Sequence, residues 1–303
     1  MEKEVKIRQS PIFYMGAKTK LLKQLLPIFP KNINNFYDLF GGSGVVSINV
    51  SAKNRYYNEI NHNVLNLFKM FKENTPEELD KHLQAQVDKF GLEVGCKRKD
   101  FATEQEWKED INKKKAKYLK FREYYNKQEN KDYRDLYLLS CYSINHLMRF
   151  NQKSEFNVNY GSTQRYIKNY IVNTYDDIKD INIICGDYKD INIVIADDTF
   201  VYCDPPYLNT TAVYNEKRAF GGWNLNNDYE LFEYLEDLNN KGVKWGLSNV
   251  FVNRGITNQH LIDWCEKNNW NVYHLDRNYN PFNRGNSDSD EVYICNYEIG
   301  ERK

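Results

Sequence analysis

Residues 201–207 read Val-Tyr-Cys-Asp-Pro-Pro-Tyr, an apolar run that stops abruptly at an acid, two prolines and an aromatic ring. The apolar residues before Asp204 predict a buried strand, and the prolines exclude both ladder pairing and helix beyond it. A carboxylate and a ring are therefore expected at the carboxyl end of a strand, where open α/β sheets bind their ligands. Taken alone, the four residues Asp204–Tyr207 are equally well explained as an ordinary turn.

The chemistry of this segment suits transfer to an exocyclic amino group of a flat base. Asp204 offers a hydrogen-bond acceptor, Pro205 a fixed backbone carbonyl and Tyr207 a stacking surface. The rest of the chain decides between this interpretation and a turn.

The composition indicates a globular protein with one large core. The 303 residues allow a catalytic α/β domain and one smaller module, and 41% are hydrophobic while 28% are charged. Lys and Arg number 42, as do Asp and Glu. Any nucleic-acid surface must therefore be a local patch, because there is no overall basic excess.

Cysteines are scattered singly, without a Cys-x-x-Cys pair, at positions 96, 141, 185, 203, 265 and 295. This pattern argues against a structural zinc site or a disulfide framework and fits a reducing compartment. No apolar run approaches the ~20 residues of a membrane span, and the first residues are charged. We expect a cytoplasmic protein without a targeting signal and without a metal.

A basic residue stands at the start of the first helical segment. Leucines at positions 21, 22, 25 and 26 form one apolar helical face within residues 10–30, and Gly16 and Lys18 precede them. A lysine at a helix amino end opposes the macrodipole, so its presence suggests an anionic neighbour. A solvated lysine is the alternative.

A glycine-rich turn follows the first predicted strand, Phe36–Phe40. Gly41-Gly42-Ser43-Gly44 then leads into the apolar run from Val45 to Val50. Such a turn lets backbone N–H groups approach a ligand, and it matches neither the phosphate loop nor the dinucleotide fingerprint. A second strand, Arg55–Glu59, ends in an acid that can accept hydrogen bonds from ribose hydroxyls.

Between residues 61 and 147 the composition shifts toward helix and charge. Acids at positions 104, 106, 109 and 110 precede a lysine cluster from residue 113 to residue 122, which predicts a solvated, ion-paired face rather than a phosphate-binding one. Aromatic residues then alternate with amides and cations in Arg149–Gly161. That mixture contacts phosphates and base edges, although an ordinary hairpin has it too.

The α/β pattern resumes after the helical block. Strands are predicted at 181–187, 199–204, 243–249, 272–275 and 291–297, with helices at 228–239 and 258–268. Their alternation predicts a largely parallel sheet of seven strands, and the last two strands, joined without a helix, predict an antiparallel edge hairpin.

The order of these blocks resembles the Dam-type (α-group, D12 class) DNA N6-adenine methyltransferases. The resemblance runs from about residue 11 to residue 299 through seven segments: Tyr14–Lys18, Phe36–Gly44, Asn58–Asn61, Arg149–Asn151, Glu155–Val158, Asp187 and Asp204–Tyr207. Several blocks in one order are far more specific than any one of them, so they favour a functional site at Asp-Pro-Pro-Tyr over a simple turn.

The resemblance implies a Rossmann-like, class I S-adenosylmethionine-dependent methyltransferase. Residues 1–61 and 162–303 would form the catalytic domain, and residues 62–161 an inserted, mainly helical target-recognition domain. The glycine loop would wrap the methionine and ribose of the cofactor, and Glu59 would hold the ribose hydroxyls. Asp187 would meet the cofactor's adenine, and Lys18 would pair with its carboxylate. The implied cofactor residues are Tyr14, Gly16, Lys18, Asp38, Phe40, Gly41, Gly42, Gly44, Glu59, Asp187 and Asp204.

The resemblance also implies a catalytic set and a DNA-contacting set. The first is Asp204, Pro205, Pro206 and Tyr207, acting on an adenine flipped from the duplex and releasing S-adenosylhomocysteine. The second comprises Asn145, Arg149, Asn151, Lys153 and Asn157. Partners would be double-stranded DNA and a cognate restriction endonuclease, in a bacterial or phage-encoded system.

Two departures bear on the target sequence. Lys153 and Asn159 stand where familiar members of the family have arginine and proline, and lysine lacks the bidentate fork that reads guanine. GATC is therefore only a first guess. Three alternatives stay open: a cytosine N4 methyltransferase, an RNA adenine methyltransferase, and an inactive DNA-binding or regulatory relative.

Overall fold

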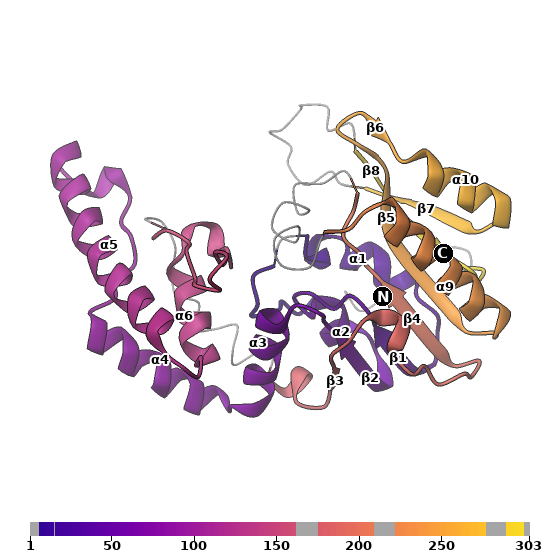
Figure 1. Cartoon of the computed structure of the whole chain (residues 1–303), viewed down its shortest axis with the longest axis horizontal. Coiled ribbons are helices and arrows are strands. Elements are labelled where there is room, and N and C mark those ends of the chain that lie inside the picture. The colour runs from indigo at the N-terminus through magenta and orange to yellow at the C-terminus, as the bar shows by residue number, and fades with distance from the viewer. Residues whose placement is uncertain (1–5, 15, 162–174, 209–221, 277–288, 300–303) are drawn as a thin grey trace. The chain divides into compact units, whose positions relative to one another are not determined.

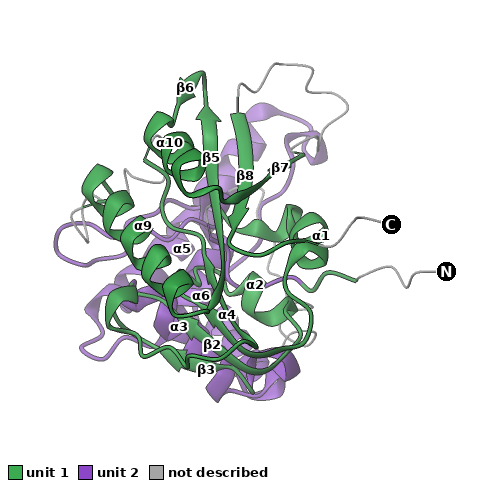
Figure 2. Ribbon diagram, turned by 90° about the vertical axis from the view of Figure 1, so that its right-hand side faces the viewer, with its two compact units in different colours: residues 1–8, 16–60, 180–303 green, residues 9–15, 61–179 purple. Residues whose placement is uncertain are grey.

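The computed structural model describes residues 6–14, 16–161, 175–208, 222–276 and 289–299. Contacts divide the chain into two compact units: unit 1 comprises residues 1–8, 16–60 and 180–303, and unit 2 comprises residues 9–15 and 61–179 (Figure 2). These cuts differ from the expected 61/62 and 161/162. Asn61 lies in unit 2, where its side chain accepts a hydrogen bond from the Asn63 N–H and caps the helix that begins at His62.

Unit 1 is built on one mixed sheet (Figure 1) in the order β3-β2-β1-β4-β5-β8-β7. The pairs from β3 to β5 are parallel, whereas β8 runs antiparallel between β5 and β7. The strands are β1 (Ile33–Asp38), β2 (Ala52–Asn58), β3 (Asn182–Ile184), β4 (Thr199–Cys203), β5 (Lys244–Asn253), β7 (Asn271–Leu275) and β8 (Ser289–Cys295). The predicted parallel sheet with its antiparallel hairpin is confirmed, and β6 (Ile256–Thr257), which pairs with β5, is an addition that the sequence did not predict.

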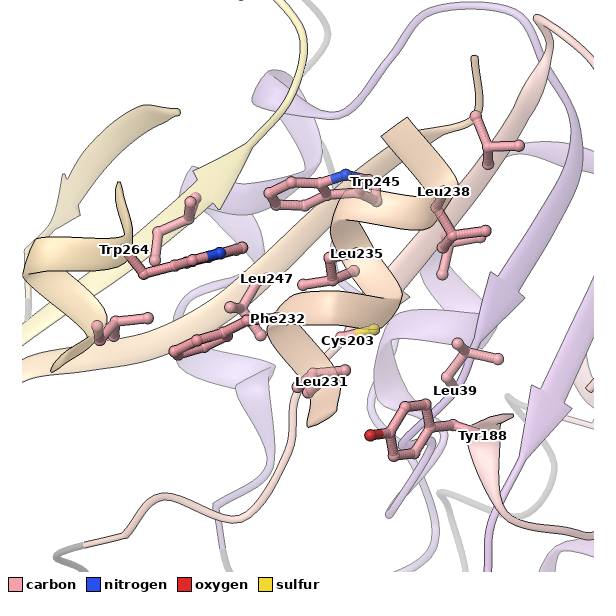
Figure 3. Close-up of a cluster of buried hydrophobic side chains, with 14 of the residues drawn as sticks. Leu39, Tyr188, Cys203, Leu231, Phe232, Leu235, Leu238, Trp245, Leu247 and Trp264 are labelled. Carbon is pink, nitrogen blue, oxygen red and sulfur yellow. The ribbon is translucent and has the colours of Figure 1, made fainter. Parts of the chain in front are cut away.

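The core of unit 1 explains why the sequences of β4 and β5 are mostly apolar. Every residue of β4 is buried, as expected for a parallel strand covered on both faces. Helix α9 (Leu225–Asn240) packs on one face through Leu231, Phe232, Leu235 and Leu238, and α10 (Gln259–Asn268) adds Trp264 (Figure 3). The Phe232 and Trp264 rings stack with centroids 4.2 Å apart. Each such side chain contributes about 1.5–3 kcal/mol when buried.

The first helical segment is short and broken. The predicted leucine face is divided among three short helices: the 3₁₀ helix η1 (Lys18–Lys20), the α-helix α1 (Leu22–Leu25) and the 3₁₀ helix η2 (Leu26–Ile28). Pro27 sits in the first turn of η2, where its missing N–H does no harm. Helix α2 (Val45–Asn49), after the glycine loop, has only five residues because β2 begins at Ala52.

In the described part of unit 2 most residues are helical, and residues 149–161 form a hairpin. The helices of this unit include α3 (His62–Glu73), α4 (Pro76–Phe90), η3 (Arg98–Asp100), α5 (Glu104–Lys127), α6 (Tyr133–Tyr142) and η4 (Ile144–His146). Capping boxes start α4 and α5, and α6 is buried along most of its length. Of the predicted ion-paired lysine face, Lys117 forms an exposed ion pair with Glu93, whereas Lys114 is buried against Asp110.

Within the described residues, the structure contains no helix that is both long enough and apolar enough to cross a bilayer.

Candidate active site

Three carboxylates gather at the carboxyl edge of the sheet in unit 1. The neighbouring strands β1, β2 and β4 are parallel, with Asp38 in register with Tyr57 and with Tyr202. Asp38 ends β1, Glu59 follows β2 and Asp204 follows β4. Burial is the main cause of the raised pKa of Asp38, and the charges of Asp204 and Glu59 raise it further, as expected for acids brought close together.

The glycine loop is tied to the end of β2. The Gly41 N–H donates to the Asn58 carbonyl over 2.8 Å, and the Gly42 N–H donates to Glu59 Oε2 over 2.9 Å. Gly42 and Gly44 have φ of +50° and +73°, which favour glycine. The loop therefore holds the buried Glu59 carboxylate in a fixed place at the end of β2.

Gly41 allows the loop to pass over Tyr57. A Cβ at Gly41 would lie 2.2 Å from Cε2 of that fully buried ring, whose hydroxyl donates to the Gly42 carbonyl. We expect Gly41→Ala to destabilise the protein by about 1–3 kcal/mol, the usual cost of overpacking. Urea denaturation measures this. The control is Gly186→Ala, whose Cβ would meet only Ile191 at 3.6 Å; equal stability of the two variants would contradict the expectation.

Asp38 is a buried acid with a strongly shifted pKa. Burial raises its pKa to about 7, the charges of Asp204 and Glu59 add to this, and the Ser47 hydroxyl, which donates to Oδ2 over 2.7 Å, opposes it. Ionising Asp38 therefore costs free energy in the folded protein.

This pKa predicts how stability depends on pH. Because the folded state holds the Asp38 proton more tightly than the unfolded state, stability is greatest below the unfolded pKa of about 4 and falls as pH rises toward about 7. We expect Asp38→Asn to remove that loss and to gain about 2–4 kcal/mol relative to wild type between pH 5 and pH 8. Urea denaturation at both pH values tests it. A difference between variant and wild type that stays constant with pH would contradict it.

Asp204 is held by a buried lysine and a tyrosine. Lys18 Nζ lies 2.6 Å from Oδ1 and 2.7 Å from Oδ2, and the Tyr207 hydroxyl donates to Oδ1 over 3.1 Å. Lys18 is 6% exposed and its Nζ is 5.0 Å from the Tyr207 ring centroid. Burial raises the pKa of Asp204, and the Lys18 charge opposes the rise. Asp204 is thus the anionic neighbour that the position of Lys18 suggested.

Asn58 was missed in the sequence, although it stands next to Glu59. Its buried side chain donates to the carbonyls of Leu39 and Gly186 and accepts from the Gly186 N–H. It thereby joins the ends of β1 and β3. The available signal in the sequence was an amide next to the acid at the end of a predicted strand.

Glu291, on β8, was also missed. It is 5% exposed, and its charge adds to the effect of burial, which is the main cause of the raised pKa of both Asp204 and Tyr207. An acid beside the apolar run Val292–Cys295 was the signal.

The remaining expected cofactor residues lie around this edge or in the other unit. Asp187 is partly exposed and caps η5 (Tyr188–Asp190) by accepting from the Lys189 N–H. Phe40 packs against the rings of Tyr188 and Trp223. Gly16 is exposed in unit 1, and its carbonyl is 3.4 Å from Lys18 Nζ. Tyr14 belongs to unit 2.

The expected DNA-contacting residues lie in unit 2. The hairpin bridges Phe150 to Phe156, and the Asn151 side chain accepts from the N–H groups of Lys153 and Glu155, so Asn151 shapes the turn. Arg149 Nε donates to Asn157 Oδ1 over 2.9 Å.

Three of the five DNA-contacting candidates are exposed. These are Asn145, Arg149 and Lys153. Asn145 also has a φ of +53°, a conformation that costs free energy outside glycine.

One group of possible metal ligands occurs in the described part of the chain: His82, Asp132 and Asp135. Its atoms are already engaged. Asp135 lies 2.8 Å from His82 Nε2 and accepts from Gln128, while Asp132 accepts from Arg134. The arrangement is a polar network between α4 and α6.

The sequence model of a family described as D12 class N6 adenine-specific DNA methyltransferase matches residues 14–280. The chain belongs to this family. Membership confirms the resemblance drawn from the ordered blocks. The strand order, with an antiparallel strand next to the last, agrees with the class I methyltransferase fold expected of the family.

The chain is similar to several curated methyltransferases and covers different shares of their lengths. It is 36% identical to modification methylase StsI of Streptococcus sanguinis over 96% of its own chain and 43% of that protein. It is 35% identical to type II methyltransferase M.FokI of Planomicrobium okeanokoites over 95% and 43%. It is 27% identical to the DNA adenine methylase of Haemophilus influenzae over 67% of its own chain and 65% of that protein. The chain spans less than half the length of the first two.

Proposed function

We propose that the protein transfers a methyl group from S-adenosylmethionine to N6 of adenine in DNA. The observation that carries this proposal is Asp204, fixed after β4 by Lys18 and Tyr207 and followed by two prolines. Membership of the D12 family supports adenine as the base and DNA as the substrate.

The residues at the sheet edge fit S-adenosylmethionine. The left-handed glycines of the loop let its backbone turn tightly at the end of β1, and the tethered Glu59 carboxylate suits two ribose hydroxyls. Asp187 would meet the adenine amino group, and Lys18 would attract the methionine carboxylate. When bound, the cofactor supplies an electrophilic methyl group on a sulfonium.

The chain's own residues would prepare the nucleophile. The N6 lone pair of adenine is delocalised into the ring, so N6 is a weak nucleophile. Asp204 and the Pro205 carbonyl would accept the two N6 hydrogens and hold the nitrogen as it pyramidalises, while Tyr207 stacks on the base. A carboxylate has about four lone-pair sites, so Asp204 can keep Lys18 while it accepts from N6.

Unit 2 would recognise the DNA. Because N6 lies inside the duplex, the adenine would be flipped out at a cost of a few kcal/mol. The hairpin at 149–161 would contact a short motif through Arg149 and Lys153, and GATC is the first motif to test. The names of the relatives favour a restriction endonuclease as the partner of the system.

Expression in a methylation-free bacterial host, followed by single-molecule sequencing, tests the proposal. We expect N6-methyladenine at one short motif, and none with Asp204→Ala. N4-methylcytosine, or methylation confined to RNA, would replace it with one of the alternatives. Absence of any modified base, with S-adenosylmethionine bound, would indicate an inactive relative.

A further inference from the structure

In the hairpin of unit 2, the second strand has backbone N–H and carbonyl groups that point away from the first strand. The hairpin is closed by the Asn151 N–H, which donates to the Glu155 carbonyl, and by the Asn157 N–H, which donates to the Arg149 carbonyl. In an antiparallel pair these residues alternate with others whose polar groups point outward. The outward groups are the N–H and carbonyl of Phe156 and the carbonyl of Val158.

Helix α5 supplies partners for these outward groups. Asn126 Nδ2 donates to the Phe156 carbonyl over 3.0 Å, and the Phe156 N–H donates to Asn126 Oδ1 over 2.8 Å. The side-chain amide of Asn126 thus pairs with Phe156 as a neighbouring strand would. The Val158 carbonyl accepts from the Tyr118 hydroxyl over 3.1 Å and from Arg122 Nη1 over 3.0 Å.

The three helix residues form one row. Tyr118, Arg122 and Asn126 are four residues apart, so their side chains lie on the same face of α5. Phe156, Val158 and Tyr118 are at most 2% exposed. Breaking these hydrogen bonds would leave buried polar groups without any partner, because water does not reach them. The loss of the row would therefore lower the stability of the folded hairpin.

We propose that Tyr118, Arg122 and Asn126 are positioning residues for sequence recognition, holding the hairpin rather than touching DNA. The inference rests on the proposed function, in which the hairpin reads the target motif. Arg122 lies in a lysine-rich helix, yet its guanidinium is used on a backbone carbonyl. The fidelity of recognition then depends on the row because a hairpin displaced by an ångström no longer presents Arg149 and Lys153 to the correct base pair.

The test compares wild type with Asn126→Leu, which has nearly the same size and makes neither hydrogen bond. The DNA probes are a duplex that carries the motif mapped for wild type and duplexes that differ from it by one base pair. We expect the ratio of kcat/KM between the mapped and altered duplexes to fall at least about tenfold, on the scale of one to two hydrogen bonds. The affinity for S-adenosylmethionine should stay within about twofold of wild type.

Glu123→Gln is the matched control. Glu123 is exposed on the same helix, next to Arg122, and pairs with Lys127. Its substitution should leave the discrimination ratio unchanged. If Asn126→Leu does not fold, Tyr118→Phe, which removes a single hydroxyl, decides the question by the same ratio.

A pH-dependent rescue separates positioning from general damage. In Asn126→Asp an ionised carboxylate still accepts from the Phe156 N–H but faces the Phe156 carbonyl with a second acceptor, whereas the protonated acid donates to that carbonyl. The unperturbed pKa of an aspartate is about 4, and the cations Arg122 and Lys131 near residue 126 favour its ionised form. We therefore expect discrimination by this variant, relative to wild type at each pH, to recover as pH falls from about 7 to about 4.

The outcomes keep the two proposals apart. If wild type methylates no DNA, the proposed function fails. If wild type methylates its motif but Asn126→Leu discriminates as well as wild type, or Asn126→Asp shows no recovery at low pH, the positioning role is wrong while the function stands.

Discussion

Replacing Asp204 by alanine is expected to lower methyl transfer by about a thousandfold or more, the loss seen when a group that binds the reacting atoms is removed. The variant loses the acceptor for the N6 hydrogens and leaves the buried Lys18 without its carboxylate. Because β4 and the glycine loop do not depend on the Asp204 side chain, binding of S-adenosylmethionine should remain measurable. Tritiated-methyl incorporation and calorimetric titration of the cofactor measure the two effects.

Asp204→Asn separates charge from shape. It keeps the size of the side chain and one oxygen acceptor, so we expect it to retain more activity than alanine. Asp237→Asn is the control, since Asp237 pairs with Lys241 in an exposed i,i+4 pair. Methyl incorporation near the wild-type rate in Asp204→Ala would refute the catalytic assignment.

Lys18→Met is expected to move the acid limb of the pH–rate profile to higher pH. The Lys18 charge holds down a pKa that burial raises, so without Lys18 the pKa of Asp204 rises further. If the ionised carboxylate binds the N6 hydrogens, activity is lost as pH falls through that higher pKa. At pH 7 we expect kcat to fall by more than about tenfold and to recover partly toward pH 9.

The same variant tests the second role proposed for Lys18. If Lys18 also binds the methionine carboxylate, the Kd for S-adenosylmethionine should rise in Lys18→Met at every pH. The control is Lys20→Met, an exposed position two residues along. An unchanged pH–rate profile in Lys18→Met would show that Asp204 does not act through its charge.

Local patterns predicted the elements and the ends of the strands. The apolar run before Asp204, the glycines after β1 and the acid after β2 each lie within a few residues of the structure they predict. The parallel sheet followed from strands alternating with helices. These signals are encoded by neighbouring residues, and the positions of Glu59 and Asp204 could therefore be predicted.

Pairing between distant residues could not be predicted in the same way. Lys18 and Asp204 are 186 residues apart, and the position of Lys18 indicated an acid without indicating which one. The lysine-rich pattern of α5 likewise predicted a solvated face. It gave no sign that Lys114 would be buried or that Arg122 would bind a backbone carbonyl. Such partners are chosen by tertiary packing, which a single sequence does not display.

The insertion of unit 2 has a consequence for how the catalytic sheet is completed. Strands β2 and β3 are neighbours, yet Asn58 and Gly186, which bond at their ends, are 128 residues apart. Were unit 2 an unfolded chain, closing that loop would cost about 1–2 kcal/mol more than a connection of roughly a dozen residues. A helical unit that folds first shortens the effective loop. Damage to the helices should therefore appear early as faster hydrogen exchange in the three-residue strand β3, at the edge that carries Asp187.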